Sequence, residues 1–587
     1  MQIDGVWTAE GNQFMEKMLN WWKTDKRYIL ALKIVLMGLL PLVACLLYCA
    51  RQGYGIGDVY LPGSEWNDEL FYFKQVEAIV NYGFPQGYFG FNESHALKLS
   101  FAAWSPVLVF PWVIWGLLFG WNLLTPIWCN IFLLTLAMVI FVWLVRPTWK
   151  QLGILTLLFL LYTPFVRYML SGMPEIICFS MLIVFYSITI SYLRKNTGGK
   201  LALLFVLAGL MTLMRPYLLL FLVLPAVLCV VKYKWKGLFG SAAIVGVVLG
   251  IYALIKHYLG AEYFAPLFFT DWVTAFFEQG LFGGLRYFCS KLYWNGLAFL
   301  QHMKGGLLAG LASGAFFWGY LAVAAVLILQ SVIDFRNMRK CGVIGKLRFC
   351  RKSAVSEEQK DRTQEMQRSA EDNDCLALFI VELHLAFSFV GMLFALLLMY
   401  KLTEGSKHLL TFMAVGVFII SLMKTKFYKK PAFIGLVFAY FYIFMALDPY
   451  DYQVPFAEDA RVAQVEYWQE IYAENLQMTD EDVPNYENAI IWVFSDSVEA
   501  ANVASGSTNQ TEGKAQSINT KWQLLYGLPE GFGISCCMPD FVMEHLEELQ
   551  CRYLGTVAGG EIDERCAETG WTEIARDEDL VVYENVK

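Results

Sequence analysis

Long apolar runs, each close to the thickness of a lipid bilayer, constrain this chain more than any other feature. Hydrophobic residues make up 57% of its 587 residues, and only 17% are charged. A helix needs about 20 mainly apolar residues to cross the hydrocarbon core, and such runs recur between residues 28 and 447. This composition excludes an ordinary soluble enzyme and a disordered chain, so we predict a polytopic α-helical membrane protein.

The first apolar run sets the orientation. Basic residues precede it, at Lys17, Lys23, Lys26 and Arg27. The run 28–50 is longer than the apolar part of a signal peptide and has no small-residue cleavage site after it. We therefore expect a retained first span, with residues 1–27 in the cytoplasm and 51–121 forming the first outer loop.

The number of spans depends on the apolar stretch 101–120. It contains Pro106 and Pro111 and is almost contiguous with the next run. If both crossed the membrane, every later basic loop would lie outside, against the positive-inside rule. We therefore predict that 101–120 is a helix in the outer interface. About eleven spans remain, at 28–50, 122–145, 151–168, 176–193, 201–214, 217–231, 237–255, 306–332, 375–400, 409–423 and 431–447.

This count divides the chain into a transmembrane domain, 28–447, and an outer domain, 448–587, in the cell membrane. Residues 334–374 are strongly charged and are predicted to form a cytoplasmic linker with some helix. In the outer domain the apolar runs 489–494, 533–537 and 580–583 are typical of buried strands. A helical pattern runs from Pro539, with Asp540 as N-cap, to about Leu554. We predict a small α/β domain.

Four cysteines of the outer domain, Cys536, Cys537, Cys551 and Cys566, lie where disulfides are permitted. One or two bridges are compatible with the sequence, and their pairing stays open. Zinc is the less favoured interpretation, because no Cys-x-x-Cys or histidine spacing supports it.

Carboxylates and aromatic rings are concentrated just beyond the first span, in Ser64-Glu65-Trp66-Asn67-Asp68-Glu69-Leu70-Phe71-Tyr72. The pattern Asp68-Glu69-x-x-Tyr72, followed by Gly83-Phe84-Pro85 and the helix with Pro106, resembles the first outer loop of the GT-C superfamily of membrane glycosyltransferases. It is most similar to the protein O-mannosyltransferase and aminoarabinose-transferase branch. The motif is short, whereas the similarity in architecture covers the whole chain.

The resemblance implies a sugar donor on a polyprenyl-phosphate or pyrophosphate carrier and an extracytoplasmic acceptor, which is a protein, lipid or polysaccharide. By position, Asp68 would be the general base that takes the acceptor proton, and Glu69 would orient it or hold the acceptor. Tyr72 would help to position the substrates. The alternative is that Asp68 and Glu69 only favour the first turn of a helix, as acids do.

Glu175 lies in the second outer loop, after Ser171-Gly172-Met173-Pro174. A carboxylate at the membrane edge is unfavourable in free energy unless it forms an ion pair or is hydrated. It either positions acceptor or donor, or only begins a helix after Pro174.

A carrier phosphate needs cations at the outer surface. Arg215 interrupts two apolar runs, although an arginine at a helix end also reaches the interface without a ligand. Lys256 flanks the aromatic outer loop 258–303. Lys407 and His408 precede a late span and resemble the Arg-Tyr-Leu-Pro type motif of the superfamily, without its proline. A lysine there can contact a phosphate with its single ammonium group, but it cannot form the bidentate contact of an arginine guanidinium.

Glu93 and His95 complete the first outer loop and could position a substrate or ligate a divalent metal. Two ligands two residues apart are weak evidence, so a divalent metal is possible but not favoured, and no cofactor is assigned.

Neither a P-loop nor a Rossmann glycine fingerprint occurs in the chain. The absence of both motifs argues against a cytoplasmic ATP-driven pump and favours a donor that arrives through the lipid phase. The net charge of -7 gives no indication of nucleic-acid binding. A transporter or flippase for lipid-linked saccharides is the main alternative, but transporters tend to place ionisable residues near the midplane. A non-catalytic assembly protein is a third possibility.

Overall fold

The computed structural model describes residues 26–64, 66–83, 105–161, 163–259, 269–308, 312–340, 361–399, 406–422, 453–476, 489–493, 522–530 and 532–585. Within these ranges, seven helical segments are long and apolar enough to cross a membrane. They belong to α2 (Lys26–Gln52), α5 (Thr125–Val145), α8 (Glu175–Arg194), η4 with α10 (Pro216–Leu222, Val223–Tyr233), α11 (Trp235–Leu259), α14 (Ala312–Lys340) and α15 (Asp361–Leu398).

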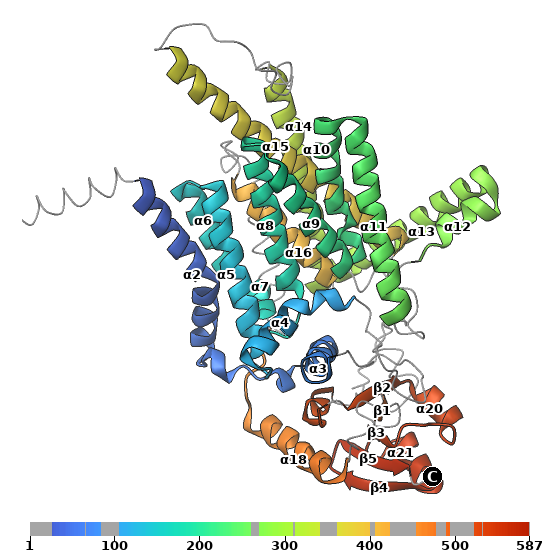
Figure 1. Cartoon of the computed structure of the whole chain (residues 1–587). Helices are drawn as coiled ribbons and strands as arrows, with labels where there is room; N and C mark the ends of the chain where they lie inside the picture. Colours follow the sequence, from blue (N-terminus) through green and yellow to red (C-terminus); the bar gives the residue numbers. More distant parts are fainter. Residues whose placement is uncertain are drawn as a thin grey trace, which may run out of the picture.

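Shorter apolar helices complete the bundle, α9 (Gly198–Met214) and α16 (Ser406–Leu422) among them. Large apolar side chains such as Val206 and Val247 are exposed on its outside, at 55% and 60%. Such a surface is stable in contact with lipid and not with water. The chain is therefore a helical integral membrane protein (Figure 1).

Several spans predicted from the sequence take a different form. The run 151–168 contains α6 (Trp149–Leu161) and α7 (Thr163–Met169), with Pro164 in the first turn of α7, and Tyr162 lies outside the described residues. The segment 258–303, predicted as an outer loop, contains two helices, α12 (Asp271–Glu278) and α13 (Gly280–Leu308). Helix α15 begins at Asp361, inside the predicted linker. The predicted span 431–447 lies outside the described residues.

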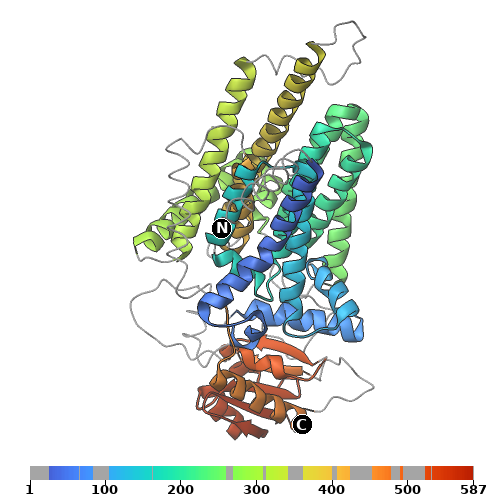
Figure 2. The ribbon, with the colours of Figure 1, turned by 90° about the vertical axis from the view of Figure 1, so that its left-hand side faces the viewer.

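Two helices from the first outer loop lie at one end of the bundle. Helix α3 (Asn67–Tyr82) runs across that end, between the membrane helices and the C-terminal domain (Figures 1 and 2). Helix α4 (Phe110–Phe119) has 10 residues, which gives about 15 Å and is too short for a hydrocarbon core of about 30 Å. An interfacial position, as predicted for 101–120, fits this length.

A hydrogen-bonded asparagine fixes α4 to the bundle. The indole nitrogen of Trp112 donates to Asn130 Oδ1 at 3.0 Å, and Asn130 Nδ2 donates to the carbonyl of Ser171 at 3.1 Å. Asn130 is fully buried. One side chain of α5 thus connects the short helix to the loop that precedes α8.

The C-terminal domain is built on a five-stranded sheet with the order β2-β1-β3-β5-β4. Its strands are β1 (Ala489–Val493), β2 (Gly533–Cys537), β3 (Tyr553–Val557), β4 (Trp571–Arg576) and β5 (Leu580–Asn585). Strand β1 pairs in parallel with β2 and β3, and β5 is antiparallel to β3 and β4. Helix α18 (Asp459–Asn475) and η8 (Trp522–Gly527) pack on one face, and α20 (Pro539–His545) and α21 (Glu561–Glu568) pack on the other.

The predicted α/β class is correct, and two strands were missed. The helical pattern expected up to Leu554 ends at His545, and Leu554 belongs to β3. Pairing with β1 and β5 on both sides places this segment in the middle of the sheet, which overrides its local pattern. The N-cap of α20 is Met538, with Pro539 at the first helical position, so Asp540 lies in the first turn.

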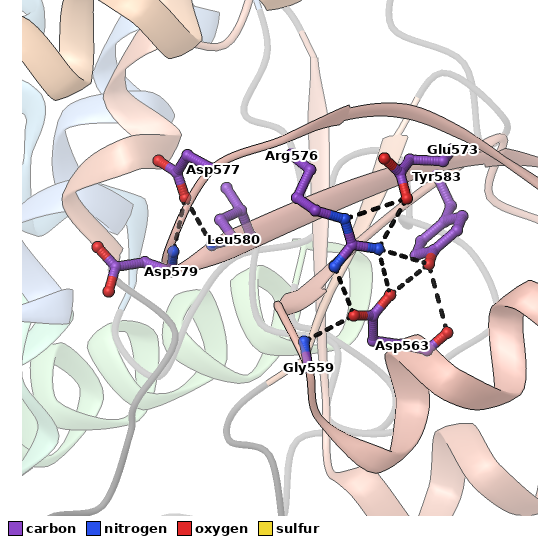
Figure 3. A network of polar contacts seen from close by, with 8 residues as sticks. All are labelled: Gly559, Asp563, Glu573, Arg576, Asp577, Asp579, Leu580 and Tyr583. Atoms are coloured by element: carbon purple, nitrogen blue, oxygen red, sulfur yellow. Dashed lines mark hydrogen bonds and ion pairs between the residues drawn. The ribbon is translucent and has the colours of Figure 1, made fainter.

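A buried carboxylate holds the far edge of this sheet (Figure 3). Asp563 of α21 accepts hydrogen bonds from Gly559 N at 2.6 Å and from the guanidinium of Arg576 at 2.7 and 2.9 Å. It also accepts from the hydroxyl of Tyr583. In the turn between β4 and β5, Asp577 accepts from the backbone nitrogens of Asp579 and Leu580.

The four cysteines of the C-terminal domain, Cys536, Cys537, Cys551 and Cys566, are all buried, and no disulfide joins them in the described structure. Three of these thiols belong to the apolar cluster under α20 and α21, where they act as small packing residues.

Candidate functional site

The site is built around the first turn of α3. After α2 the chain turns through two short 3₁₀ helices, η1 (Ile56–Asp58) and η2 (Leu61–Gly63). Ser64 Oγ then accepts a hydrogen bond from Trp66 N at 3.1 Å, and α3 begins at Asn67. Asp68 and Glu69 therefore lie in the first turn, where the helix dipole favours negative charge.

Glu69 is fully buried and paired with an arginine from another helix. Its two carboxylate oxygens lie 3.1 and 3.4 Å from the two terminal nitrogens of Arg167, in α7. Gly172 N donates to the same carboxylate at 3.2 Å. Three donors thus hold Glu69 and join the start of α3 to the loop before α8.

Arg167 is held from several sides. Besides Glu69, its guanidinium donates to Ser64 Oγ at 3.1 Å and lies over the ring of Trp66, with Cζ 3.9 Å from the ring centroid. A cation over an indole face is stabilised when water is excluded, and Arg167 is 2% exposed. These contacts fix the segment that leads into α3.

A second buried ion pair lies at the same end of the bundle. Arg215 Nη2 is 2.6 Å from Glu175 Oε1, and its other terminal nitrogen donates to the hydroxyl of Tyr217 at 3.1 Å. Both charged side chains are almost fully buried. Glu175 begins α8, and Arg215 lies between α9 and η4. Arg215 therefore neutralises a carboxylate, in addition to any contact with a phosphate.

Tyr72 lies in the same helix as Glu69, one turn further along. It is buried on the side of α3 that faces the bundle, where its ring meets that of Trp112 at 6.5 Å. It also interacts electrostatically with Arg215. The structure thus brings Asp68, Glu69, Tyr72, Glu175 and Arg215, all predicted as site residues, to one end of the bundle.

Asp68 differs from its neighbour. It is half-buried, whereas Glu69 is inaccessible. A general base must be able to reach the proton that it removes. Of the two adjacent acids, Asp68 is the one that a substrate can approach.

Within the described part of the chain, the structure does not bring the remaining predicted site residues into this cluster. Lys256 is exposed in the last turn of α11. Lys407 and His408 lie in the first turn of α16, and their side chains lie outside the described residues. Glu93 and His95 also lie outside them. Within the described ranges, no group of three or more His, Cys, Asp or Glu side chains is arranged to hold a metal ion.

The C-terminal domain contributes directly to this region. Leu70 and Phe71 of α3 belong to the same apolar cluster as the sheet residues Ile490 and Trp492. Lys74 Nζ donates to Glu77 at 2.9 Å and to the carbonyl of Leu528 at 3.1 Å. Helix α3 is thus packed between two hydrophobic cores, with Tyr72 and Val76 in the core of the bundle.

Sequence reasoning missed Arg167, Lys74 and Tyr526. A signal existed for Arg167, because an arginine inside the apolar run 151–168 is costly without a partner. Lys74 gave a weaker signal, as a lysine within the largely apolar stretch after Asp68. Tyr526 lies 457 residues after Glu69 in the chain, and nothing local indicates that it packs beside α3.

These features define a class, an integral membrane protein with a buried acidic site between its helix bundle and a C-terminal α/β domain. Two solved structures of ArnT from Cupriavidus metallidurans, one bound to undecaprenyl phosphate and one in the apo state, are similar to the chain. The TM-scores are 0.37 and 0.35, and the sequence identity is 12% in both comparisons. Each alignment covers 94% of this chain and 98% of the ArnT chain.

No protein-family model matches the chain, and no curated protein sequence matches it. At TM-scores below 0.5 the ArnT structures transfer no residue role to this chain.

Proposed function

We propose that this protein is a membrane glycosyltransferase of the GT-C type. It would move a sugar from a polyprenyl-phosphate carrier to an extracytoplasmic acceptor, with Asp68 as general base. The observation that carries the proposal is the position of Asp68. This half-buried carboxylate lies in the first turn of a helix that two hydrophobic cores and the buried Glu69–Arg167 ion pair hold in place.

In the proposed reaction, Asp68 accepts the proton of the acceptor hydroxyl or amine as that atom attacks the anomeric carbon. A new bond forms between the acceptor atom and the anomeric carbon, and the bond from that carbon to the phosphate oxygen breaks. The polyprenyl phosphate leaves with the bonding electrons. A cation beside the leaving oxygen stabilises the developing charge, and Lys407 at the start of α16 is our candidate for it.

Glu69 has a supporting role in this scheme. Its oxygens are engaged by Arg167 and Gly172, so it is not available to take a proton. It fixes the direction in which the first turn of α3 presents Asp68. Preorganisation of this kind accounts for much of enzymatic rate enhancement.

The transporter alternative depends on ionisable groups near the bilayer midplane. His384 of α15 is such a group, but it has two structural partners. Its ring nitrogens lie 3.1 Å from the hydroxyl of Tyr186 and 3.2 Å from the carbonyl of Leu220. These contacts favour a packing role for His384, and the acidic site at the bundle end favours a transferase.

The decisive experiment combines purified protein with a panel of polyprenyl-phosphate sugars and cell-envelope acceptors. We expect Asp68→Asn to lose transfer by about 10²–10⁴-fold, the usual contribution of a general base, while keeping the wild-type melting temperature. Equal transfer by both proteins would remove Asp68 from the mechanism. Movement of saccharide across vesicles without any bond change would instead establish a transporter.

A further inference from the structure

Buried hydrogen-bond donors near the start of α3 lack a partner within the described residues. They are the hydroxyl of Tyr526, Arg167 Nε and the indole nitrogen of Trp121. Buried polar atoms are almost always hydrogen-bonded, and an unsatisfied one costs about 1–3 kcal/mol. Each of these atoms therefore calls for a partner outside the described residues.

Tyr526 is the member of this group that comes from the C-terminal domain. It lies in η8, and its ring packs against Phe73 of α3 with the centroids 5.5 Å apart. The ring of Trp121 also packs against Phe73, with the centroids 5.0 Å apart. Tyr526 contacts the core of the bundle as well as the core of the C-terminal domain. It is thus located where the two domains meet.

The hydroxyl of Tyr526 also lies in the field of the ion pair that holds α3. Burial raises its pKa well above the usual value, the charge of Glu69 raises it further, and Arg167 opposes this effect. The phenol is therefore neutral and can donate a hydrogen bond. Since Glu69 already balances the charge of Arg167, the surroundings favour a neutral partner over an anion.

We propose that Tyr526 is an acceptor-binding residue and that its hydroxyl donates to an oxygen of a saccharide acceptor. This inference rests on the proposed glycosyl transfer. The hydroxyl of Tyr526, Arg167 Nε and the indole nitrogen of Trp121 are donors, and Glu175 Oε2 at the same end of the bundle is an acceptor without a partner in the described residues. A ligand with hydroxyl groups, which both accept and donate, fits this set. The neighbouring rings of Phe73 and Trp121 supply an apolar wall, as binding sites for small organic groups usually do. The C-terminal domain would then form part of the active site.

A purely structural role makes a different prediction. The ring of Tyr526 fills the junction, and Tyr526→Phe keeps that ring while removing only the hydroxyl. Because the hydroxyl has no partner within the described residues, its loss should not lower stability. A change in kinetics without a fall in melting temperature is therefore specific to ligand binding.

The test uses the full-length protein in lipid nanodiscs. Cell-envelope polysaccharide that the wild type modifies is titrated as acceptor, and undecaprenyl phosphate alone is titrated by tryptophan fluorescence. For Tyr526→Phe we expect the acceptor KM to rise about three- to tenfold, as for loss of one neutral hydrogen bond. We expect no change in kcat, in the Kd of undecaprenyl phosphate or in the melting temperature.

Tyr467→Phe is the matched control, because Tyr467 is an exposed tyrosine of α18 in the same domain. It should leave every quantity unchanged. An acceptor KM for Tyr526→Phe within twofold of wild type overturns the proposal, and so does a lower melting temperature with a parallel loss of kcat. A KM effect seen only with a peptide acceptor overturns the saccharide assignment.

The proposed function is tested independently of the role of Tyr526. If Asp68→Asn transfers sugar as well as wild type, the catalytic assignment is wrong, whatever Tyr526 does. If the wild type modifies no acceptor, both proposals are overturned.

Discussion

Arg167 holds both carboxylate oxygens of Glu69, at 3.1 and 3.4 Å, across 98 residues of sequence. The pair is inaccessible to solvent, with side chains exposed by 3% and 0%. A buried pair of this kind contributes little net stability, but removal of one partner leaves an uncompensated charge. It therefore acts mainly as a positional constraint on α3.

We expect Arg167→Gln to destabilise the protein by about 3–5 kcal/mol, the usual cost of breaking a buried ion pair from one side. Glutamine removes the charge that balances Glu69 and cannot form the bidentate contact. Thermal unfolding in detergent, followed by intrinsic fluorescence, measures the effect.

Arg565→Gln provides the control, because Arg565 pairs with Glu568 at 3.3 Å on an exposed surface. Its effect should stay below about 1 kcal/mol, as for surface ion pairs. Equal melting temperatures for Arg167→Gln and wild type would contradict the constraint.

Asn130→Leu should destabilise the packing of α4. Leucine has nearly the same size, but it leaves the buried indole nitrogen of Trp112 and the carbonyl of Ser171 without their partner. An unsatisfied buried group costs about 1–3 kcal/mol. Hydrogen exchange of the amides in α4 should become faster, and those of α18 serve as an internal reference. Unchanged exchange in α4 would show that apolar packing alone holds it.

Much of the architecture could be predicted from the sequence because its signals are local. Apolar length indicates helices such as α2 and α5, and short continuous apolar runs indicate β1, β2 and β5. Strand β3 could not be recognised, because its identity comes from pairing with β1 and β5. Gly555 in β3 contributes to this pairing, since a Cβ there would lie 2.7 Å from the ring of Trp492.

The site was predictable only in part for the same reason. Asp68 and Glu69 could be found because they follow the first span and begin a helix. Their different environments depend on Arg167, which no local pattern connects with Glu69. Likewise, Arg215 was predicted as a cation near the surface, but its partner Glu175 lies 40 residues earlier in the chain. Long-range partners of this kind require the folded structure.

The C-terminal sheet should lose stability in acid. Burial alone would raise the pKa of Asp577, but hydrogen bonds from Gln464, Trp468 and two backbone nitrogens outweigh it and lower the pKa. A carboxyl with a lowered folded-state pKa stabilises the fold above its unfolded pKa of about 3.9. That stability is lost as pH falls from this value towards the folded-state pKa.

An acid titration followed by hydrogen exchange of β4 and β5 measures this loss. Asp577→Asn removes the titrating group, so its stability should change less below about pH 4 than that of wild type. An identical acid profile for both proteins would show that other carboxyls govern the transition. Asp563 is the leading alternative, since hydrogen bonds from Arg576, Tyr583 and Gly559 lower its pKa against the effect of burial.

The proposed topology places the C-terminal domain outside the cell. Glu470 of α18 is exposed, so Glu470→Cys provides a reporter there. A membrane-impermeant maleimide should label it in intact cells when Cys289, an exposed native thiol, is replaced by serine. Labelling only after permeabilisation would place the domain inside and would exclude an extracytoplasmic reaction at Asp68.

The contact of Lys74 with the C-terminal domain leads to the last prediction. Lys74 is 2% exposed and donates to Glu77 and to the carbonyl of Leu528. Burial raises the pKa of Glu77, and Lys74 opposes this effect. Lys74→Met removes both hydrogen bonds, so we expect the junction to weaken by about 1–3 kcal/mol and the amides of α3 to exchange faster.

Two further variants separate the buried contact from general loosening of the junction. Asn81→Ala removes an exposed hydrogen bond to Glu530 in the same junction, and exchange in α3 should change little because exposed bonds contribute less. Lys74→Met combined with Glu77→Leu should recover much of the loss, because replacing both buried partners by apolar groups is nearly neutral. If the double variant is as unstable as the single one, the lost hydrogen bond to Leu528, and not the uncompensated charge of Glu77, accounts for the effect of Lys74→Met.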